Sequence, residues 1–245
     1  PALKAADIGI AMGGRGTDVA REASSLVLLN DDVDSIVQAV RLGRRIYRNI
    51  SHAMSYRIAV HVPTAGMAFI PLLFGWPMVF FPLHIVFFQF VIDPVCSIAF
   101  EAEPTDDEAM RQPPRPPGAT LFSFHAVVLS LFQGAGVLLA VAAIYGYAML
   151  HGGEIEARAM AFTTIIFGNL ALILASRSRT RPIMETLAQT NPALWAIVGG
   201  TLAALALVLY VPTLRRLFRL AALSPSALLA CVAAALSGVL CFEIH

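Results

Sequence analysis

The sequence predicts a mainly α-helical membrane protein, a polytopic bundle of six spans preceded by a small α/β segment. Of the 245 residues, 58% are hydrophobic and only 13% are charged. The mean hydropathy is +0.73, and such values are typical of polytopic membrane proteins. Six apolar stretches are each close to the roughly 20 residues that cross a bilayer. The first part of the chain instead alternates short apolar runs with turn residues, a pattern that favours soluble α/β structure.

Charge and cysteine content narrow the class further. The formal net charge of +1 gives no indication of nucleic-acid binding. The three cysteines, Cys96, Cys231 and Cys241, lie in apolar runs, so we expect reduced thiols and no disulfide framework. The N-terminus lacks the charged and apolar regions of a signal peptide and begins with Pro1 instead of Met. We therefore expect a fragment of a longer polypeptide.

Residues 1–48 are predicted to form the end of a soluble domain. Four features are predicted in order: a strand over Asp7–Met12, a turn at Gly13–Gly16, a helix capped by Thr17 or Asp18, and a strand over Ser25–Leu29. Two strands do not close a core alone. The glycine-rich turn is either a simple tight turn or an anion-binding nest of backbone N–H groups.

A long helix is expected from near Ser35, capped by Asp34, to about Val62. Its apolar residues recur at helical spacing while its arginines stay on other faces. About 28 residues at 1.5 Å each would extend about 40 Å. We expect this helix to carry movement of the soluble part into the membrane, and the alternative is an ordinary basic helix at the interface.

The apolar spans are predicted near residues 53–74, 79–100, 125–150, 158–176, 193–212 and 224–243. The Pro-rich segment 101–123 is too polar to cross. With six spans both termini lie on one side, taken as cytoplasmic, and the arginine-rich segment 176–191 is then inside, as positive charge tends to be. Arginines in the predicted outer loop 213–223 run against that tendency.

The most informative stretch, His84–Glu103, is apolar but carries Gln89, Asp93 and Pro94 near its middle. An ionised carboxylate at membrane depth costs several kcal/mol, so it needs a cation, a proton or a partner. Gln89 and Asp93 share one helix face, and Pro94 leaves the carbonyl of Phe90 without a helical donor. These oxygens predict a cation pocket, and the alternative is an aspartate bonded to a neighbouring helix.

The preceding span offers further candidate ligands. His61 and Thr64 share a face, and Pro63 frees the carbonyl of Ala59. A neutral histidine beside Asp93 would relay a proton or bind a metal, whereas the plain alternative is a packing histidine. Two further candidates are Cys96, one turn after Asp93, and Asn169 in the fourth span, which either completes the pocket or bonds between helices.

Three segments carry a family resemblance: PALKAADIGIAMGGRGTDVAREASSLVLL at the start, HIVFFQFVIDP through EAEP, and the diverged MRQPPRPP of Met110–Pro117. Together they resemble the C-terminal part of a P-type cation-transporting ATPase, most closely the calcium-pump-like branch of bacteria. The resemblance implies that residues 1–48 end a HAD-like phosphorylation domain with its stalk helix, and that residues 49–245 form the cation-transport domain. ATP, Mg²⁺ and the phosphorylated aspartate would belong to domains preceding Pro1, so this chain alone would not hydrolyse ATP.

The resemblance also marks transport positions. The family's ligand positions fall on His61 and Thr64 in the first span and on Gln89, Ile92 and Asp93 in the second. Asp93 matches the family and Gln89 is a close substitute, whereas the other three positions depart from the family pattern. Calcium takes six to eight oxygens, usually with several carboxylates, whereas Asp93 is the single carboxylate of this set. The implied partners are the lipid bilayer of the plasma membrane, a transported cation and the upstream ATPase domains. A non-catalytic membrane module or secondary carrier with a proton site at Asp93 is the alternative function.

Overall fold

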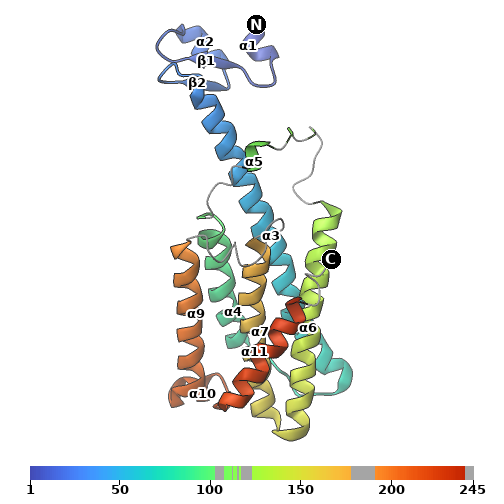
Figure 1. Cartoon of the computed structure of the whole chain (residues 1–245). Helices are drawn as coiled ribbons and strands as arrows, with labels where there is room; N and C mark the ends of the chain where they lie inside the picture. The colour runs from blue at the N-terminus through green and yellow to red at the C-terminus, as the bar shows by residue number, and fades with distance from the viewer. Residues whose placement is uncertain (103–107, 112, 115, 117–122, 178–190, 241–245) are drawn as a thin grey trace. The chain divides into compact units, whose positions relative to one another are not determined.

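The computed structural model describes residues 1–102, 108–111, 113, 114, 116, 123–177 and 191–240. Within these ranges the side chains of six residues lie outside the description: Asp93, Cys96, Ser97, Glu108, Ala109 and Arg177. The chain forms two compact units. One comprises Pro1–Arg48 with Pro104–Arg115, and the other comprises Asn49–Glu103 with Pro116–His245 (Figure 1).

The smaller unit is built on a pair of parallel strands. Strand β1 (Ile10–Met12) pairs with β2 (Leu26–Leu28), and helix α2 (Asp18–Ala23) connects them. Thr17 caps α2 as expected, because its hydroxyl accepts the N–H of Ala20 at 3.2 Å. The strands are shorter than predicted, and a one-turn helix, α1 (Ala2–Ala5), precedes them. The segment Pro104–Arg115 that joins this unit contains the short helix α5 (Glu108–Arg111).

Helix α3 (Asp34–Phe74) is one element of 41 residues, so the predicted long helix and the first predicted span are continuous. The first turn of α3 takes its side-chain hydrogen bond from Asp32 and not from the predicted cap Asp34. The carboxylate of Asp32 accepts the backbone N–H of Asp34 at 3.0 Å. Pro63 and Pro71 lie inside the helix, where each removes one backbone donor.

The larger unit is entirely helical in its described part. After α3 its helices are α4 (Pro82–Pro94), the π-helix η1 (Val95–Ala99), α6 (Phe124–His151), α7 (Glu154–Arg177), α9 (Pro192–Tyr210), α10 (Pro212–Leu217) and α11 (Pro225–Leu240). Among the described residues, four helices are long and apolar enough to cross a membrane: α3, α6, α7 and α9. Two shorter apolar helices, α4 and α11, occupy the second and sixth predicted spans. The mainly α, polytopic membrane architecture is confirmed.

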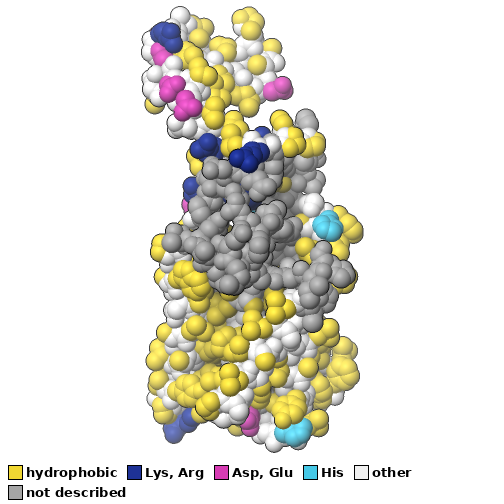
Figure 2. Space-filling view, in the orientation of Figure 1, with side chains coloured by type: hydrophobic (Ala, Val, Ile, Leu, Met, Phe, Trp, Pro, Cys, Tyr) yellow, Lys and Arg dark blue, Asp and Glu magenta, His cyan; other side chains and the backbone are white. Residues whose placement is uncertain are grey.

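Helix α7 is the centre of this bundle. Of its most apolar window 83% is buried, against 28% for each of the other three long helices. Helices α4, α6, α9 and α11 all contact it (Figure 1). The visible face of the larger unit is mostly hydrophobic, and charged side chains gather at its lower end (Figure 2). An apolar exterior with charges at the end is what a bilayer requires.

Candidate cation site

The depth of Asp93 in the bundle follows from how α3 and α4 pack. The rings of Tyr56 on α3 and Phe100 after η1 lie 5.6 Å apart. These neighbouring helices run in opposite directions, because only residues 75–81 connect them. Seven residues after Tyr56 is Pro63, and seven residues before Phe100 is Asp93. Because an α-helix rises about 1.5 Å per residue and the π-helical turn η1 differs from this, Pro63 and Asp93 share a depth to within about one helical turn.

A second pair of contacts places Asn169 at that depth. Phe88 of α4 stacks on Phe162 of α7 with ring centroids 5.2 Å apart, and the two helices start at the same end of the bundle. Seven residues on from this pair are Val95 and Asn169. Three helices therefore bring Pro63, Asp93 and Asn169 to one layer, within about one helical turn.

Asn169 is the most unusual polar side chain in this layer. It is fully buried, and neither its amide nitrogen nor its amide oxygen has a hydrogen-bond partner among the described residues. A buried polar group without a partner costs about 1–3 kcal/mol. Such groups in native proteins usually indicate a water, an ion or another ligand. The candidate Asn169 is thus placed where it can contribute an oxygen to a bound cation.

Helix α4 changes its winding directly after the candidate carboxylate. The π-helical turn η1 begins at Val95, one residue after Pro94, and the N–H of Phe100 bonds the carbonyl of Val95 at 3.2 Å. Single π-helical turns within longer helices are frequent at functional sites. The side chains of Asp93 and Cys96 lie outside the described part of the structure, so their roles stay predictions.

The other candidate ligands lie on more accessible surface. Thr64 is half-buried and its hydroxyl donates to the carbonyl of Val60 at 3.2 Å. Gln89 is exposed. His61 is exposed too, with Nδ1 2.7 Å from the carbonyl oxygen of Arg57. It lines an open, largely apolar groove of about 490 Å³ between α3 and α6.

The carbonyl of Ala59, which Pro63 leaves without a helical donor, packs against α6. A Cβ atom added to Gly134 would lie 2.4 Å from this oxygen, so only glycine allows the approach. Interfaces between membrane helices commonly use such small residues, with Cα–H groups against carbonyl oxygens. The close packing of α6 on α3 therefore depends on a glycine at position 134.

No cluster of three or more His, Cys, Asp or Glu side chains able to hold a metal is present among the described side chains. The predicted ligands are instead oxygens of an amide, a hydroxyl, backbone carbonyls and the carboxylate of Asp93, and they stay predictions. Oxygen ligands suit hard cations.

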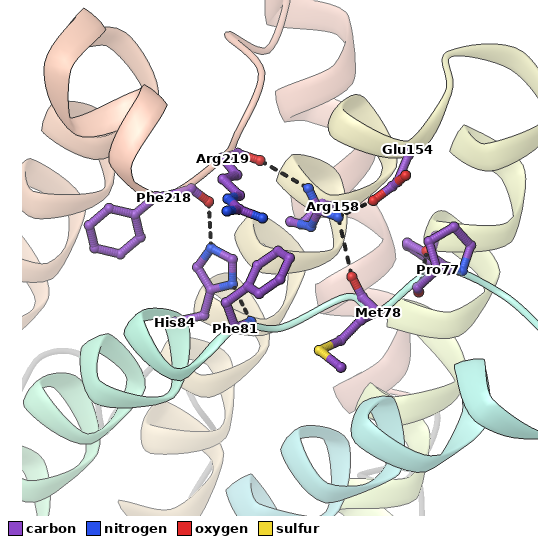
Figure 3. Close-up of polar contacts among 9 residues, drawn as sticks. Pro77, Met78, Phe81, His84, Glu154, Arg158, Phe218 and Arg219 are labelled. Carbon is purple, nitrogen blue, oxygen red and sulfur yellow. Dashed lines mark hydrogen bonds and ion pairs between the residues drawn. The ribbon is translucent and has the colours of Figure 1, made fainter.

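The other end of the bundle contains a polar cluster that the sequence analysis did not predict (Figure 3). Arg158 of α7 is 3% exposed and donates to the carbonyls of Arg219 at 3.2 Å and Met78 at 3.3 Å. It also pairs with Glu154, and its guanidinium lies over the ring of Phe81. A buried arginine is costly unless it is paired and hydrogen-bonded, and these contacts supply that. The signal in the sequence was a lone arginine at the start of an apolar span.

His84 ties α4 into the same cluster (Figure 3). Its Nδ1 accepts the N–H of Phe81 at 3.0 Å, and its Nε2 lies 2.7 Å from the carbonyl oxygen of Phe218. These two partners assign the neutral tautomer with the proton on Nε2. His84 is fully buried. Its role here is to cap α4 and to fasten that helix to the segment after α10.

The contacts of Arg219 explain one of the basic residues in the predicted outer loop 213–223. It has a left-handed backbone conformation, φ 52°, and its carbonyl accepts a hydrogen bond from Arg158. Its guanidinium lies 4.8 Å from the centroid of the Phe81 ring, a cation–π contact. Arg215 and Arg216 lie in the last turn of α10, where positive charge complements the helix dipole.

In the smaller unit, backbone N–H groups of the glycine-rich turn form an anion-binding nest. The anion that they bind is the carboxylate of Asp31 in the same unit. Asp31 accepts the backbone N–H groups of Gly14 at 2.8 Å and Arg15 at 3.0 Å. The bond from Gly14 is the main cause that lowers the pKa of Asp31, with smaller contributions from Arg15, while burial opposes the shift. The turn therefore holds the start of α2 to the end of β2.

The fold defines a polytopic helical membrane protein. Residues 77–245 match the sequence model of the family described as "Cation transporting ATPase, C-terminus". Because that match covers more than half of the chain, the protein belongs to this family, and the resemblance seen in the sequence is confirmed.

Individual relatives agree with the family. Calcium-transporting ATPase 1 of Lactococcus lactis is 35% identical over 246 residues, which cover all of this chain and 28% of the relative. Calcium-transporting ATPase 1 of Schizosaccharomyces pombe is 32% identical over 89% of this chain and 24% of its own length. Human calcium-transporting ATPase type 2C member 2 is 32% identical, with 89% and 23% covered. The chain thus spans about a quarter of the length of these relatives.

Proposed function

We propose that this chain is the membrane transport part of an ATP-driven P-type pump, and that a cation binds where α3, α4 and α7 bring Pro63, Asp93 and Asn169 to one depth. The observation that carries this proposal is the fully buried amide of Asn169 without a partner among the described residues. A carboxylate at membrane depth needs a positive partner, and an unpaired amide oxygen in the same layer is a ready ligand for it.

The remaining ligands are proposed from the candidate set. Thr64 is half-buried beside this layer, whereas His61 and Gln89 face outward from this chain. Since the chain spans about a quarter of its relatives' length, we propose that other parts of the intact protein cover this face. The site would then close only in the full pump, and His61 and Gln89 would line it from their present helices.

ATP and Mg²⁺ are proposed to act in domains outside this chain, where the resemblance places the phosphorylated aspartate. Helix α3 belongs to both compact units and contains no non-helical break. We propose that a displacement of its first part is passed along the hydrogen-bonded helix to Pro63. This continuity supports a coupling in which phosphorylation changes the affinity and access of the cation layer.

The test uses the purified full-length protein and measures phosphoenzyme formation from labelled ATP while Ca²⁺, Mn²⁺, Na⁺, K⁺ or pH is varied. The wild type should respond to one of these ions, and Asp93→Asn should abolish that response. Asn169→Ala should raise the concentration of the same ion needed for half-maximal phosphorylation. The control is Asp18→Asn, because Asp18 is exposed and pairs only with Arg21 in the smaller unit. A wild-type ion response in Asp93→Asn would place the site elsewhere.

A further inference from the structure

The side chain of Asn191 joins the start of α9 to the end of η1 by hydrogen bonds. Its side-chain oxygen accepts the N–H of Leu194 at 3.0 Å, which caps α9. Its side-chain nitrogen donates to the carbonyl of Ala99 at 3.0 Å. The residue is 1% exposed, so both bonds lie away from solvent. One buried amide therefore serves two helices that are distant in the sequence.

The bond to Ala99 matters because of where it falls. Ala99 is the last residue of η1, the π-helical turn that follows Asp93 and Pro94 directly. A π-helical turn is rarely stable by its own backbone bonds and depends on its surroundings. Helix α9 packs on η1, and Asn191 provides that contact with a directional donor. A different orientation of this turn would rotate the segment that carries Asp93.

We infer that Asn191 is a positioning residue for the cation layer, acting through the carbonyl of Ala99 to fix the winding of the helix after Asp93. The inference rests on the proposed function, because it assigns Asn191 a role in the affinity of that same site. Asn191 itself lies two turns beyond Asp93 along the helix axis and is not a ligand. Sequence reasoning did not single it out, because an Asn before a Pro at a helix start is an ordinary cap.

Two substitutions separate the cap from the contact with Ala99. Asn191→Ser keeps a good capping hydroxyl but is too short to bond the carbonyl of Ala99. Asn191→Asp keeps the size and the capping acceptor but has no N–H to donate. The matched control is Ser123→Ala, which removes the side-chain cap of α6, where Ser123 accepts the N–H of Ala126 at 3.1 Å. That control loses a helix cap and leaves the end of η1 untouched.

The readout is the half-maximal concentration of the stimulating ion for phosphoenzyme formation by the full-length protein. Both Asn191 variants should raise it about three- to tenfold, the change that loss of one hydrogen bond produces. The half-maximal ATP concentration should stay at the wild-type value, and Ser123→Ala should show no shift in the ion concentration. Size-exclusion profiles and melting temperatures of all variants establish that they are folded.

The outcomes separate the two proposals. If the wild type responds to an ion and the folded Asn191 variants keep its half-maximal concentration, the positioning role is wrong while the pump proposal stands. Equal shifts in the ion and ATP concentrations, or the same shift in Ser123→Ala, would reduce Asn191 to a structural cap and overturn the inference. A wild type that forms phosphoenzyme without any ion dependence would overturn both.

Discussion

Replacing Gly134 by alanine should force α3 and α6 apart. An added Cβ would lie 2.4 Å from the carbonyl oxygen of Ala59 and 2.7 Å from the Cβ of Val62, whereas ordinary contacts begin at 3.4 Å. The nearest atom belongs to the backbone, so no side-chain rotation relieves the clash. The two helices must separate by about 1 Å or bend, and overpacking of this kind typically costs about 1–3 kcal/mol.

The same substitution elsewhere in the bundle provides the control. Gly199 lies inside α9, and a Cβ added there meets nothing within 4 Å. Alanine is favoured over glycine in helices by about 1 kcal/mol, so Gly199→Ala should be neutral or stabilising. The two variants add the same methyl group to a helical glycine, and only the neighbouring helix differs.

The assay is thermal unfolding of the purified full-length protein in detergent, followed by size-exclusion chromatography after heating. A loss of about 1–3 kcal/mol should lower the melting temperature of Gly134→Ala by several degrees, at about 2–4 °C per kcal/mol for a domain of this size. Gly199→Ala should melt at or slightly above the wild type. Equal melting temperatures for the two variants would show that α6 does not approach Ala59 as closely as described.

Two further predictions concern the polar contacts of each unit. Arg158→Met should lower the melting temperature, because it removes the donor to two buried carbonyls at a cost of about 2–4 kcal/mol. The control Arg216→Gln, at the exposed end of α10, should leave the melting temperature unchanged. Equal effects of the two substitutions would refute the buried role of Arg158. For Asp31, the folded-state pKa is lowered, so its stabilising contribution is present above the unfolded pKa of about 3.9 and is lost as pH falls through the folded pKa. Asp31→Asn should therefore melt below the wild type at pH 6, with the gap closing on acidification below about pH 4; a gap that is constant with pH would contradict the nest.

The sequence was most informative where local physics decides the structure. Hydropathy located the apolar helices found among the described residues, because a bilayer leaves few alternatives. The start of α2 was predicted from Thr17 and Asp18, and of these two candidate caps Thr17 makes the hydrogen bond. The first turn of α3 shows the limit of this reasoning, since Asp34 and Asp32 are equally good capping residues by type. The loop conformation gives that hydrogen bond to Asp32.

The features that escaped prediction depend on tertiary contacts. The π-helical turn after Pro94 carries no distinct sequence signal, and its partner Asn191 is 92 residues away from Ala99. Arg219 looked anomalous in the sequence because it lies in a predicted outer loop, and Arg158 was not singled out. The carbonyl and aromatic partners of both arginines become visible only in the structure. The candidate cation ligands, Asn169 included, stay predictions.

The cluster around Arg158 ties together segments that are distant in the sequence. Short connections join the helices at this end: residues 75–81 between α3 and α4, two glycines between α6 and α7, and residues 218–224 between α10 and α11. Arg158 bonds the first and the last of these connections through the carbonyls of Met78 and Arg219, and His84 of α4 bonds the last one through the carbonyl of Phe218. A movement of α7 at this end therefore carries α4 and the segment before α11 with it.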